Sequence, residues 1–171
     1  MLMKKDIAFE EQGPMRPLPR LLLAVAPVAL VAILGSLVTT PNIPDWYASL
    51  EKPTGTPPNW LFGPVWTVLY GLMAFAFWRV LGLPRDTPRR SLAIATFSAQ
   101  LVLNLAWSFV FFGLRSPLAA FVVILLLVAA ILACILVLGQ IDTASAVALV
   151  PYGLWVLYAT FLNAGVWWLN G

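Results

Sequence analysis

The sequence predicts an all-α integral membrane protein, a bundle of five transmembrane helices with a long, structured first loop. The composition is the first reason, because 61% of the 171 residues are hydrophobic and only 10% are charged, against about 25% in a typical soluble domain. The second reason is that the polar residues fall between five apolar runs, each near the roughly 20 residues that a membrane-spanning helix needs. We therefore expect one membrane domain at residues 20–171, preceded by an extension without motifs at residues 1–19.

The five apolar runs lie near residues 20–39, 60–81, 91–112, 117–139 and 144–168. The first run follows a basic segment, as the apolar part of a cleaved signal peptide does. It is long, however, Pro27 interrupts its centre, and no small-x-small cleavage site ends it. We therefore expect it to be retained as the first helix. A protein of the remaining four helices is the alternative.

Helix-capping residues place the starts of three helices. The proline pair at 57–58 suits a first turn, where backbone N–H groups lack intrahelical partners, so the second helix should start around residues 58 to 62. Ser116 can supply the N-cap of the fourth helix. Either Asp142 or Thr143 can cap the fifth.

The basic residues predict the orientation in the membrane. Eight of them precede the first run or surround the link between the second and third runs, namely Lys4, Lys5, Arg16, Arg20, Arg79, Arg85, Arg89 and Arg90. Only Lys52 and Arg115 fall on the other side. By the positive-inside rule, the N-terminus is cytoplasmic. The first loop and the C-terminus then lie outside, which is the periplasm in a Gram-negative host.

Four polar or aromatic residues share one face of the third run: Gln100, Asn104, Trp107 and Ser108. Amides are costly in hydrocarbon and normally face the inside of a bundle. They can bond neighbouring helices, worth roughly 0.6–2 kcal/mol per bond, or anchor a ligand in a cavity. The spacing favours neither interpretation.

Aromatic side chains share faces of the second and fifth runs. These faces carry Trp66 and Tyr70 on the second run, and Tyr152, Trp155, Ala159 and Leu162 on the fifth. Packing in the protein core is the simpler interpretation of these tryptophans. Aromatic walls with a few amides are also what a flat hydrophobic ligand requires.

Three small residues, Ser91, Ala95 and Ala99, repeat every four positions on the third run. Such a face lets helices approach closely. It predicts a dimer seam, although packing within one chain explains it equally well.

Several classes of function are disfavoured by the composition. The chain has no histidine, no cluster of acids and a single cysteine, Cys134, so we expect no disulfide, no metal site and no required cofactor. The net charge of +3 comes from few residues and forms no stripe for nucleic acid. Phosphate loops, nucleophile–base pairs and ionisable residues in mid-span are missing, which argues against a hydrolase or an ion-coupled pump.

Four segments carry a resemblance to a known family. They are WYASLEKP (46–53), PPNWLFGPVWTVLYGLM (57–73), QLVLNLAWSFVFFG (100–113) and PYGLWVLYATFLN (151–163). In this order, and over nearly the whole chain after residue 20, they resemble the TspO/MBR family of tryptophan-rich sensory proteins. The family includes the translocator proteins, or peripheral-type benzodiazepine receptors.

The resemblance implies a five-helix bundle, commonly a homodimer, in the inner membrane of a bacterium. It implies a cavity beneath the first loop that binds tetrapyrroles such as protoporphyrin IX and haem, and in related members sterol-like or benzodiazepine-type ligands. The implied role is that of a receptor, sensor or carrier in porphyrin metabolism or stress responses. Light-dependent degradation of porphyrin is the alternative.

Carried over position by position, the resemblance gives the cavity eleven residues. They are Trp46, Pro53, Trp66, Tyr70, Asn104, Trp107, Ser108, Tyr152, Trp155, Ala159 and Leu162. Among them, Trp66 and Trp155 match the tryptophans that the family links to porphyrin photochemistry. No other catalytic residue is implied.

Two positions depart from the family pattern. Gly55 stands where relatives usually carry a tryptophan in the first loop. Because glycine adds backbone freedom, we expect a looser loop and weaker ligand retention. No basic residue follows Arg115, so the sterol motif proposed for the end of the fifth helix is incomplete.

Overall fold

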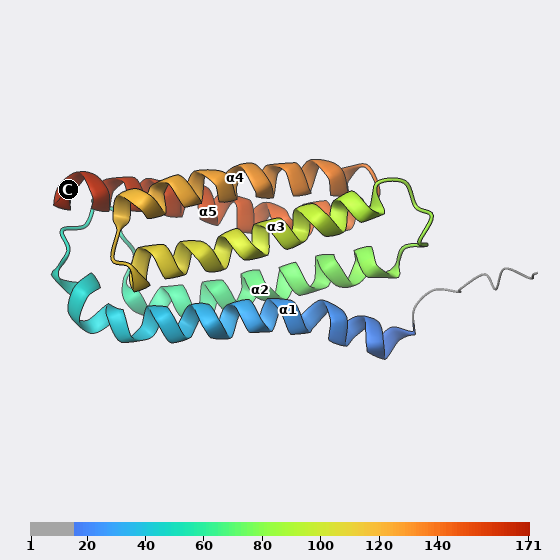
Figure 1. Ribbon diagram of the computed structural model, residues 1–171, viewed down its shortest axis with the longest axis horizontal. Helices are drawn as coiled ribbons and strands as arrows, with labels where there is room; N and C mark the ends of the chain where they lie inside the picture. The colour runs from blue at the N-terminus through green and yellow to red at the C-terminus, as the bar shows by residue number, and fades with distance from the viewer. Residues whose placement is uncertain (1–15) are drawn as a thin grey trace, which may run out of the picture.

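The computed structural model describes residues 16–171, and within this range the backbone forms five long helices and no strand (Figure 1). They are α1 (Pro17–Thr39), α2 (Asn59–Gly82), α3 (Arg90–Ser108), α4 (Pro117–Gly139) and α5 (Thr143–Asn170). Each is long and apolar enough to cross a bilayer, two of them with the short turns that continue them. The predicted fold class and the five spans are confirmed. Residues 1–15, which hold Lys4, Lys5 and most of the predicted extension, lie outside the described range.

The helix starts follow the capping residues. α2 begins at Asn59, directly after the proline pair. The hydroxyl of Ser116 accepts a hydrogen bond from the backbone N–H of Ala119 at 3.4 Å, and the carboxylate of Asp142 accepts one from the N–H of Ser145 at 3.0 Å. These side chains satisfy donors that a helix start leaves without partners, which is why the predicted caps are correct.

Two helices end in turns of irregular pitch. After α1 come a 3₁₀ turn, η1 (Thr40–Asn42), and a π-helical turn, η2 (Ile43–Tyr47); after α3 comes a second π-helical turn, η3 (Phe109–Gly113). The side chains of η2 and η3 pack together in a small aromatic cluster at the end of the bundle where the first loop lies. The first loop therefore starts on a packed base.

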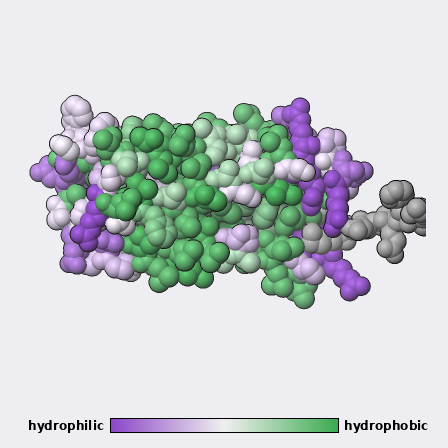
Figure 2. All heavy atoms as spheres, viewed as in Figure 1, coloured by the Kyte–Doolittle hydropathy of each residue, from purple (hydrophilic) through white to green (hydrophobic). Residues whose placement is uncertain are grey.

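The two ends of the bundle carry different segments. The start of α1, the α2–α3 loop and the α4–α5 turn lie at one end, and the first loop, the α3–α4 link and the C-terminus lie at the other (Figure 1). Between the ends, the surface is mostly apolar (Figure 2). Large side chains on it, such as Leu136 and Leu154, are exposed. A surface of this kind requires hydrocarbon around it, so the chain is an integral membrane protein.

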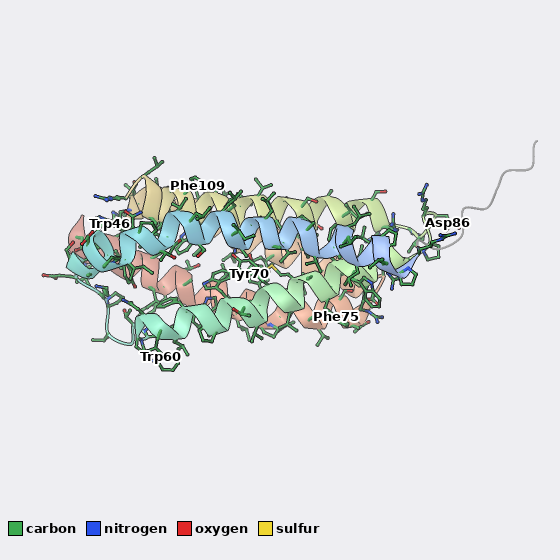
Figure 3. All side chains as sticks on the ribbon, turned by 90° about the horizontal axis from the view of Figure 1, so that it is seen from below. Trp46, Trp60, Tyr70, Phe75, Asp86 and Phe109 are labelled. Carbon is green, nitrogen blue, oxygen red and sulfur yellow. The ribbon has the colours of Figure 1, made fainter. Side chains whose placement is uncertain are left out.

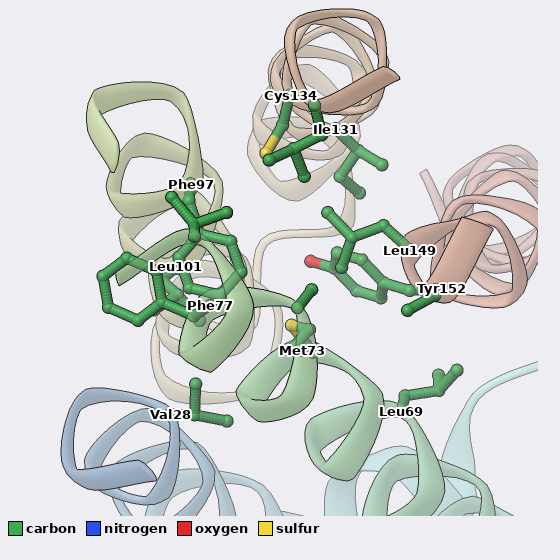
Figure 4. Packing of buried hydrophobic residues seen from close by; sticks show 14 of the residues in the cluster. Val28, Leu69, Met73, Phe77, Phe97, Leu101, Ile131, Cys134, Leu149 and Tyr152 are labelled. Atoms are coloured by element: carbon green, nitrogen blue, oxygen red, sulfur yellow. The ribbon is translucent and has the colours of Figure 1, made fainter. Parts of the chain in front are cut away.

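The packed core fills the half of the bundle nearer the α2–α3 loop. Phe77 and Phe97 stack there with ring centroids 4.4 Å apart, and Met73, Leu149 and Tyr152 meet at the centre (Figure 4). Cys134 is buried in the same core. The other half, towards the first loop, contains a cavity beside the aromatic cluster of η2 and η3.

Candidate ligand cavity

A cavity of about 560 Å³ occupies the half of the bundle below the first loop. Its size falls within the usual range for small-molecule sites. Its walls come from α1, α2, α3, η3 and α5, and both ends of the first loop border it. None of its lining residues is charged. The cavity therefore suits a largely apolar ligand.

Seven of the eleven predicted site residues line this cavity: Trp66, Tyr70, Trp107, Ser108, Trp155, Ala159 and Leu162. The other four, Trp46, Pro53, Asn104 and Tyr152, lie outside its lining. Residues from the faces on the second, third and fifth runs thus line one cavity, but not every residue of these faces reaches it.

Indole and phenyl rings form the walls. Trp66 lies beside Tyr70 on α2, with ring centroids 5.3 Å apart, and Phe62 packs edge-on against Trp155 of α5 at 5.9 Å. Tyr70 points between the helices near the middle of the bundle (Figure 3). Aromatic rings arranged in this way present large apolar faces, which can stack on a flat ligand.

A buried polar network lies directly behind this wall. The Tyr70 hydroxyl donates to Oδ1 of Asn104 at 3.2 Å, and Nδ2 of Asn104 donates to the Tyr152 hydroxyl at 3.1 Å. One amide thus joins α2, α3 and α5. Of the two interpretations of the polar face, Asn104 supports interhelical bonding, because its side chain is buried and both of its atoms are used.

Trp107 supports both interpretations at once, and Ser108 supports the cavity alone. The indole N–H of Trp107 donates to Oδ1 of Asn163 at 2.9 Å, and the amide of Asn163 donates to the carbonyl of Pro117 at 2.8 Å. The indole is therefore fixed by α5 and α4 while its ring faces the cavity. Ser108 lines the cavity opposite α1, where a Cβ on Gly35 would lie 3.5 Å from its hydroxyl.

Gln100 differs from the rest of its face. Its side chain is 0% exposed, and neither amide atom has a hydrogen-bond partner among residues 16–171. A buried amide without partners costs roughly 1–3 kcal/mol. It is therefore neither an interhelical bond nor part of the cavity wall.

We expect Gln100→Met to leave the free energy of unfolding unchanged or to raise it by about 1 kcal/mol, because an apolar side chain of similar volume removes the unpartnered amide. Asn104→Leu should instead lower it by about 1–2 kcal/mol. Thermal unfolding of both variants in the same detergent measures the difference. Equal destabilisation would show that Gln100 makes bonds that its surroundings do not reveal.

The walls also contain residues that the sequence patterns did not single out. They are Ala32, Gly35, Ser36 and Thr39 on α1, Phe62 on α2, Phe111 in η3 and Asn163 on α5. The α1 set consists of small residues spaced by three or four positions, which places them on one face. That spacing is a sequence signal for a shared face, but the uniform hydrophobicity of the run hides it.

Trp46 and Pro53 hold the first loop in place from outside the cavity. Trp46 packs edge-on against Phe111 and Phe112 of η3, with centroids 5.5 and 6.1 Å away. Pro53 lies so close to Gly165 of α5 that a Cβ on that glycine would be 2.6 Å from the proline ring. These contacts fix the base and the middle of the loop.

Hydrogen bonds to α5 add to this attachment. The Tyr158 hydroxyl donates to the carbonyl of Gly55 at 2.6 Å. The side chain of Asn170 bonds the backbone N–H and carbonyl of Glu51, both at 2.9 Å. The first loop is thus docked on α5 by partners more than 100 positions away in sequence.

Gly55 has a different role from the expected one. It lies at φ +92° in a turn that the N–H of Thr56 closes on the carbonyl of Pro53 at 3.2 Å. Glycine is favoured there because other residues rarely adopt this conformation. The glycine at position 55 is therefore required by the turn, and its backbone freedom is not a reason to expect a loose first loop. A tryptophan at this position would strain the turn, so it would not restore a relative's loop.

The predicted dimer seam lies on the outside of α3. Ser91, Ala95 and Ala99 are all exposed, so packing within one chain does not account for them. A second copy could reach this face, and the homodimer stays a prediction.

Comparison with known proteins agrees with this geometry. The TspO/MBR family model matches residues 23–169. The tryptophan-rich protein TspO of Archaeoglobus fulgidus is 40% identical over 154 residues, which cover 88% of this chain and 97% of that protein. Protein CrtK of Rhodobacter capsulatus is 38% identical over 125 residues, 73% of this chain and 78% of that protein.

The human translocator protein is also 38% identical over 125 residues, which cover 71% of this chain and 73% of that protein. Similarity of this extent reaches from α1 to the end of α5. The resemblance of the four motifs is thereby confirmed: the chain belongs to the TspO/MBR family.

Proposed function

We propose that the protein is a membrane receptor or sensor that binds a tetrapyrrole, such as protoporphyrin IX or haem, in the cavity below the first loop. The observation that carries this proposal is an uncharged cavity of about 560 Å³ with indoles from α2, α3 and α5 in its walls. Relatives named tryptophan-rich sensory protein and translocator protein are consistent with a role in sensing or carrying.

The polarity of the walls suggests how such a ligand would lie. Ser36, Thr39, Thr40 and Asn59 line the end nearest the first loop, and their hydroxyl and amide groups can donate hydrogen bonds to carboxylates. Trp66 and Trp155 stand nearer the middle of their helices. The macrocycle would stack on the indoles, with its carboxylates towards the loop.

Titration of the protein in nanodiscs with protoporphyrin IX tests this proposal through quenching of tryptophan fluorescence. We expect saturable quenching, and we expect Trp155→Ala to raise the Kd about tenfold, since loss of one stacking face costs about 1.4 kcal/mol. Trp168→Ala is the matched control, because Trp168 lies on the same helix but is 83% exposed and outside the cavity. Non-saturable quenching, or equal effects of the two variants, would refute the proposal.

Light-dependent degradation of porphyrin is a second candidate, because the two tryptophans that the family resemblance singles out, Trp66 and Trp155, line the same cavity. An oxidisable indole next to a photosensitiser can take part in such a reaction. Illumination of the complex in the presence of dioxygen, which is the oxidant and the source of the added oxygen atoms, should then produce a bilin-like absorbance band that both Trp66→Phe and Trp155→Phe abolish. Bleaching at the same rate without protein would exclude this activity and leave the binding proposal untouched.

A further inference from the structure

The end of the bundle opposite the first loop carries an excess of positive charge. Within residues 16–171 it holds six arginines, Arg16, Arg20, Arg79, Arg85, Arg89 and Arg90, and two aspartates, Asp86 and Asp142, which leaves a net charge of +4 for this part of the chain. Asp86 lies at this end, in the α2–α3 loop (Figure 3). Among residues 16–171 the single ion pair is Arg79–Asp142 at 2.7 Å. Five arginines thus lack a carboxylate partner in the described chain.

The Arg20 side chain packs against the last turn of α2. Its guanidinium carbon lies 3.9 Å from the centroid of the Trp78 ring. A Cβ on Gly82 would come within 2.1 Å of its Nη1 atom, so the group lies against the helix backbone in space that only glycine leaves. Its Nε atom is buried and has no hydrogen-bond partner among the described residues.

Arg90 reaches the same turn from α3. Its Nε donates to the carbonyl of Val80 and its Nη2 to the carbonyl of Leu81, both at 3.3 Å. Two guanidinium groups from different helices therefore lie on residues 78–82 of α2. A guanidinium group has five N–H donors, so an anion bound at this turn can accept hydrogen bonds from donors of both groups that the chain does not use.

The surroundings indicate the source of the anion. The leucines next to Arg20 face outwards, and Leu18 and Leu22 are 67% and 62% exposed. On α3, Leu92 beside Arg90 is exposed as well. Figure 2 shows the apolar surface giving way to hydrophilic residues at this end of the bundle. Arginines flanked by exposed leucines at such a boundary lie at the depth of a lipid phosphate, with the acyl chains alongside the leucines.

We propose that Arg20 and Arg90, seated on the Trp78–Gly82 turn of α2, bind the phosphate of an anionic phospholipid at this end of the bundle. The phosphate accepts hydrogen bonds from both guanidinium groups, and the acyl chains lie along the exposed leucines of α1 and α3. This site is separate from the ligand cavity and does not depend on the function proposed for it.

Native mass spectrometry of the full chain with phosphatidylglycerol or phosphatidylcholine tests the proposal. The unaltered protein should retain phosphatidylglycerol about tenfold more strongly, and Arg20→Gln with Arg90→Gln should remove this preference. Arg85→Gln with Arg89→Gln is the charge-matched control, because both arginines are exposed at the same end and, among the described residues, neither side chain forms a hydrogen bond or cation–π contact with this turn. An equal loss in the control would mean diffuse attraction and would overturn the site.

Gly82→Ala distinguishes a specific lipid-binding site from a general effect of net charge. The added Cβ displaces Arg20 without changing any charge, so we expect the preference for phosphatidylglycerol to fall. Gly71→Ala on the same helix, where a Cβ meets nothing within 4 Å, should leave it unchanged. Unchanged preference in Gly82→Ala would overturn the proposal. So would displacement of the lipid by millimolar inorganic phosphate, since a free anion would then be the ligand.

Discussion

Replacing Asp142 with alanine should lower the free energy of unfolding by about 2–4 kcal/mol. Its carboxylate accepts hydrogen bonds from Nε and Nη2 of Arg79 on α2, at 2.8 and 2.7 Å, and caps α5 through the N–H of Ser145. The Asp142 side chain is 11% exposed and that of Arg79 38%. Loss of the cap costs about 1 kcal/mol. Loss of the carboxylate also leaves the Arg79 guanidinium without its bidentate partner, which costs about 1–3 kcal/mol more.

Unfolding in detergent micelles measures this effect. Asp86→Ala is the control, because Asp86 lies at the same end and forms no ion pair within residues 16–171. Asp142→Asn should show a smaller loss, since an amide oxygen can still cap α5. Equal stability of the Asp142→Ala and Asp86→Ala variants would show that the ion pair does not join α2 to α5.

The stabilisation by Asp142 should also depend on pH. The hydrogen bonds from Arg79 hold the pKa of this carboxyl well below its usual range; the bonds from Ser145 act in the same direction, and partial burial opposes them. Because the folded pKa lies below the unfolded value of about 3.9, the contribution is fully present above that pH and is lost as the pH falls towards the folded pKa. The stability difference between the unaltered protein and Asp142→Asn should therefore be constant from about pH 7 to 5 and shrink below about pH 4.

The helices could be predicted from the sequence because their signals are local. Apolar runs of membrane length, prolines before Asn59 and the caps at Ser116 and Asp142 all act within one or two turns. The cavity face on α2, α3 and α5 was predictable for the same reason, since helical spacing brings Trp66, Tyr70 and other residues to one side.

Depth and docking could not be predicted, because they depend on how helices pack against each other. Spacing places Asn104 on the same face as Ser108, but only the bundle shows that its amide lies behind the wall and bonds Tyr152. The Arg79–Asp142 pair joins positions 63 apart, and the Tyr158–Gly55 bond joins positions 103 apart. No local pattern encodes such partners.

Moving the first loop off α5 should speed the release of a bound porphyrin about three- to tenfold, an increase that corresponds to about 0.7–1.4 kcal/mol. Gly165→Ala makes this change, because the new Cβ would lie 2.6 and 2.7 Å from Cγ and Cβ of Pro53. A proline ring cannot rotate away, so the loop itself has to shift. Both ends of that loop border the cavity, at Tyr47 and at Asn59.

Gly153→Ala separates loop displacement from the general effect of alanine. Both substitutions remove a glycine from α5 and raise helix propensity by up to about 1 kcal/mol, but a Cβ at Gly153 meets only Ile131 and Ile135, at ordinary contact distances of 3.5 and 3.6 Å. Stopped-flow dissociation of protoporphyrin IX, together with hydrogen exchange of residues 51–56, should therefore change in Gly165→Ala and not in Gly153→Ala. Faster exchange of the loop with an unchanged dissociation rate would mean that the loop is docked on α5 without closing the cavity, and that the ligand leaves by another path.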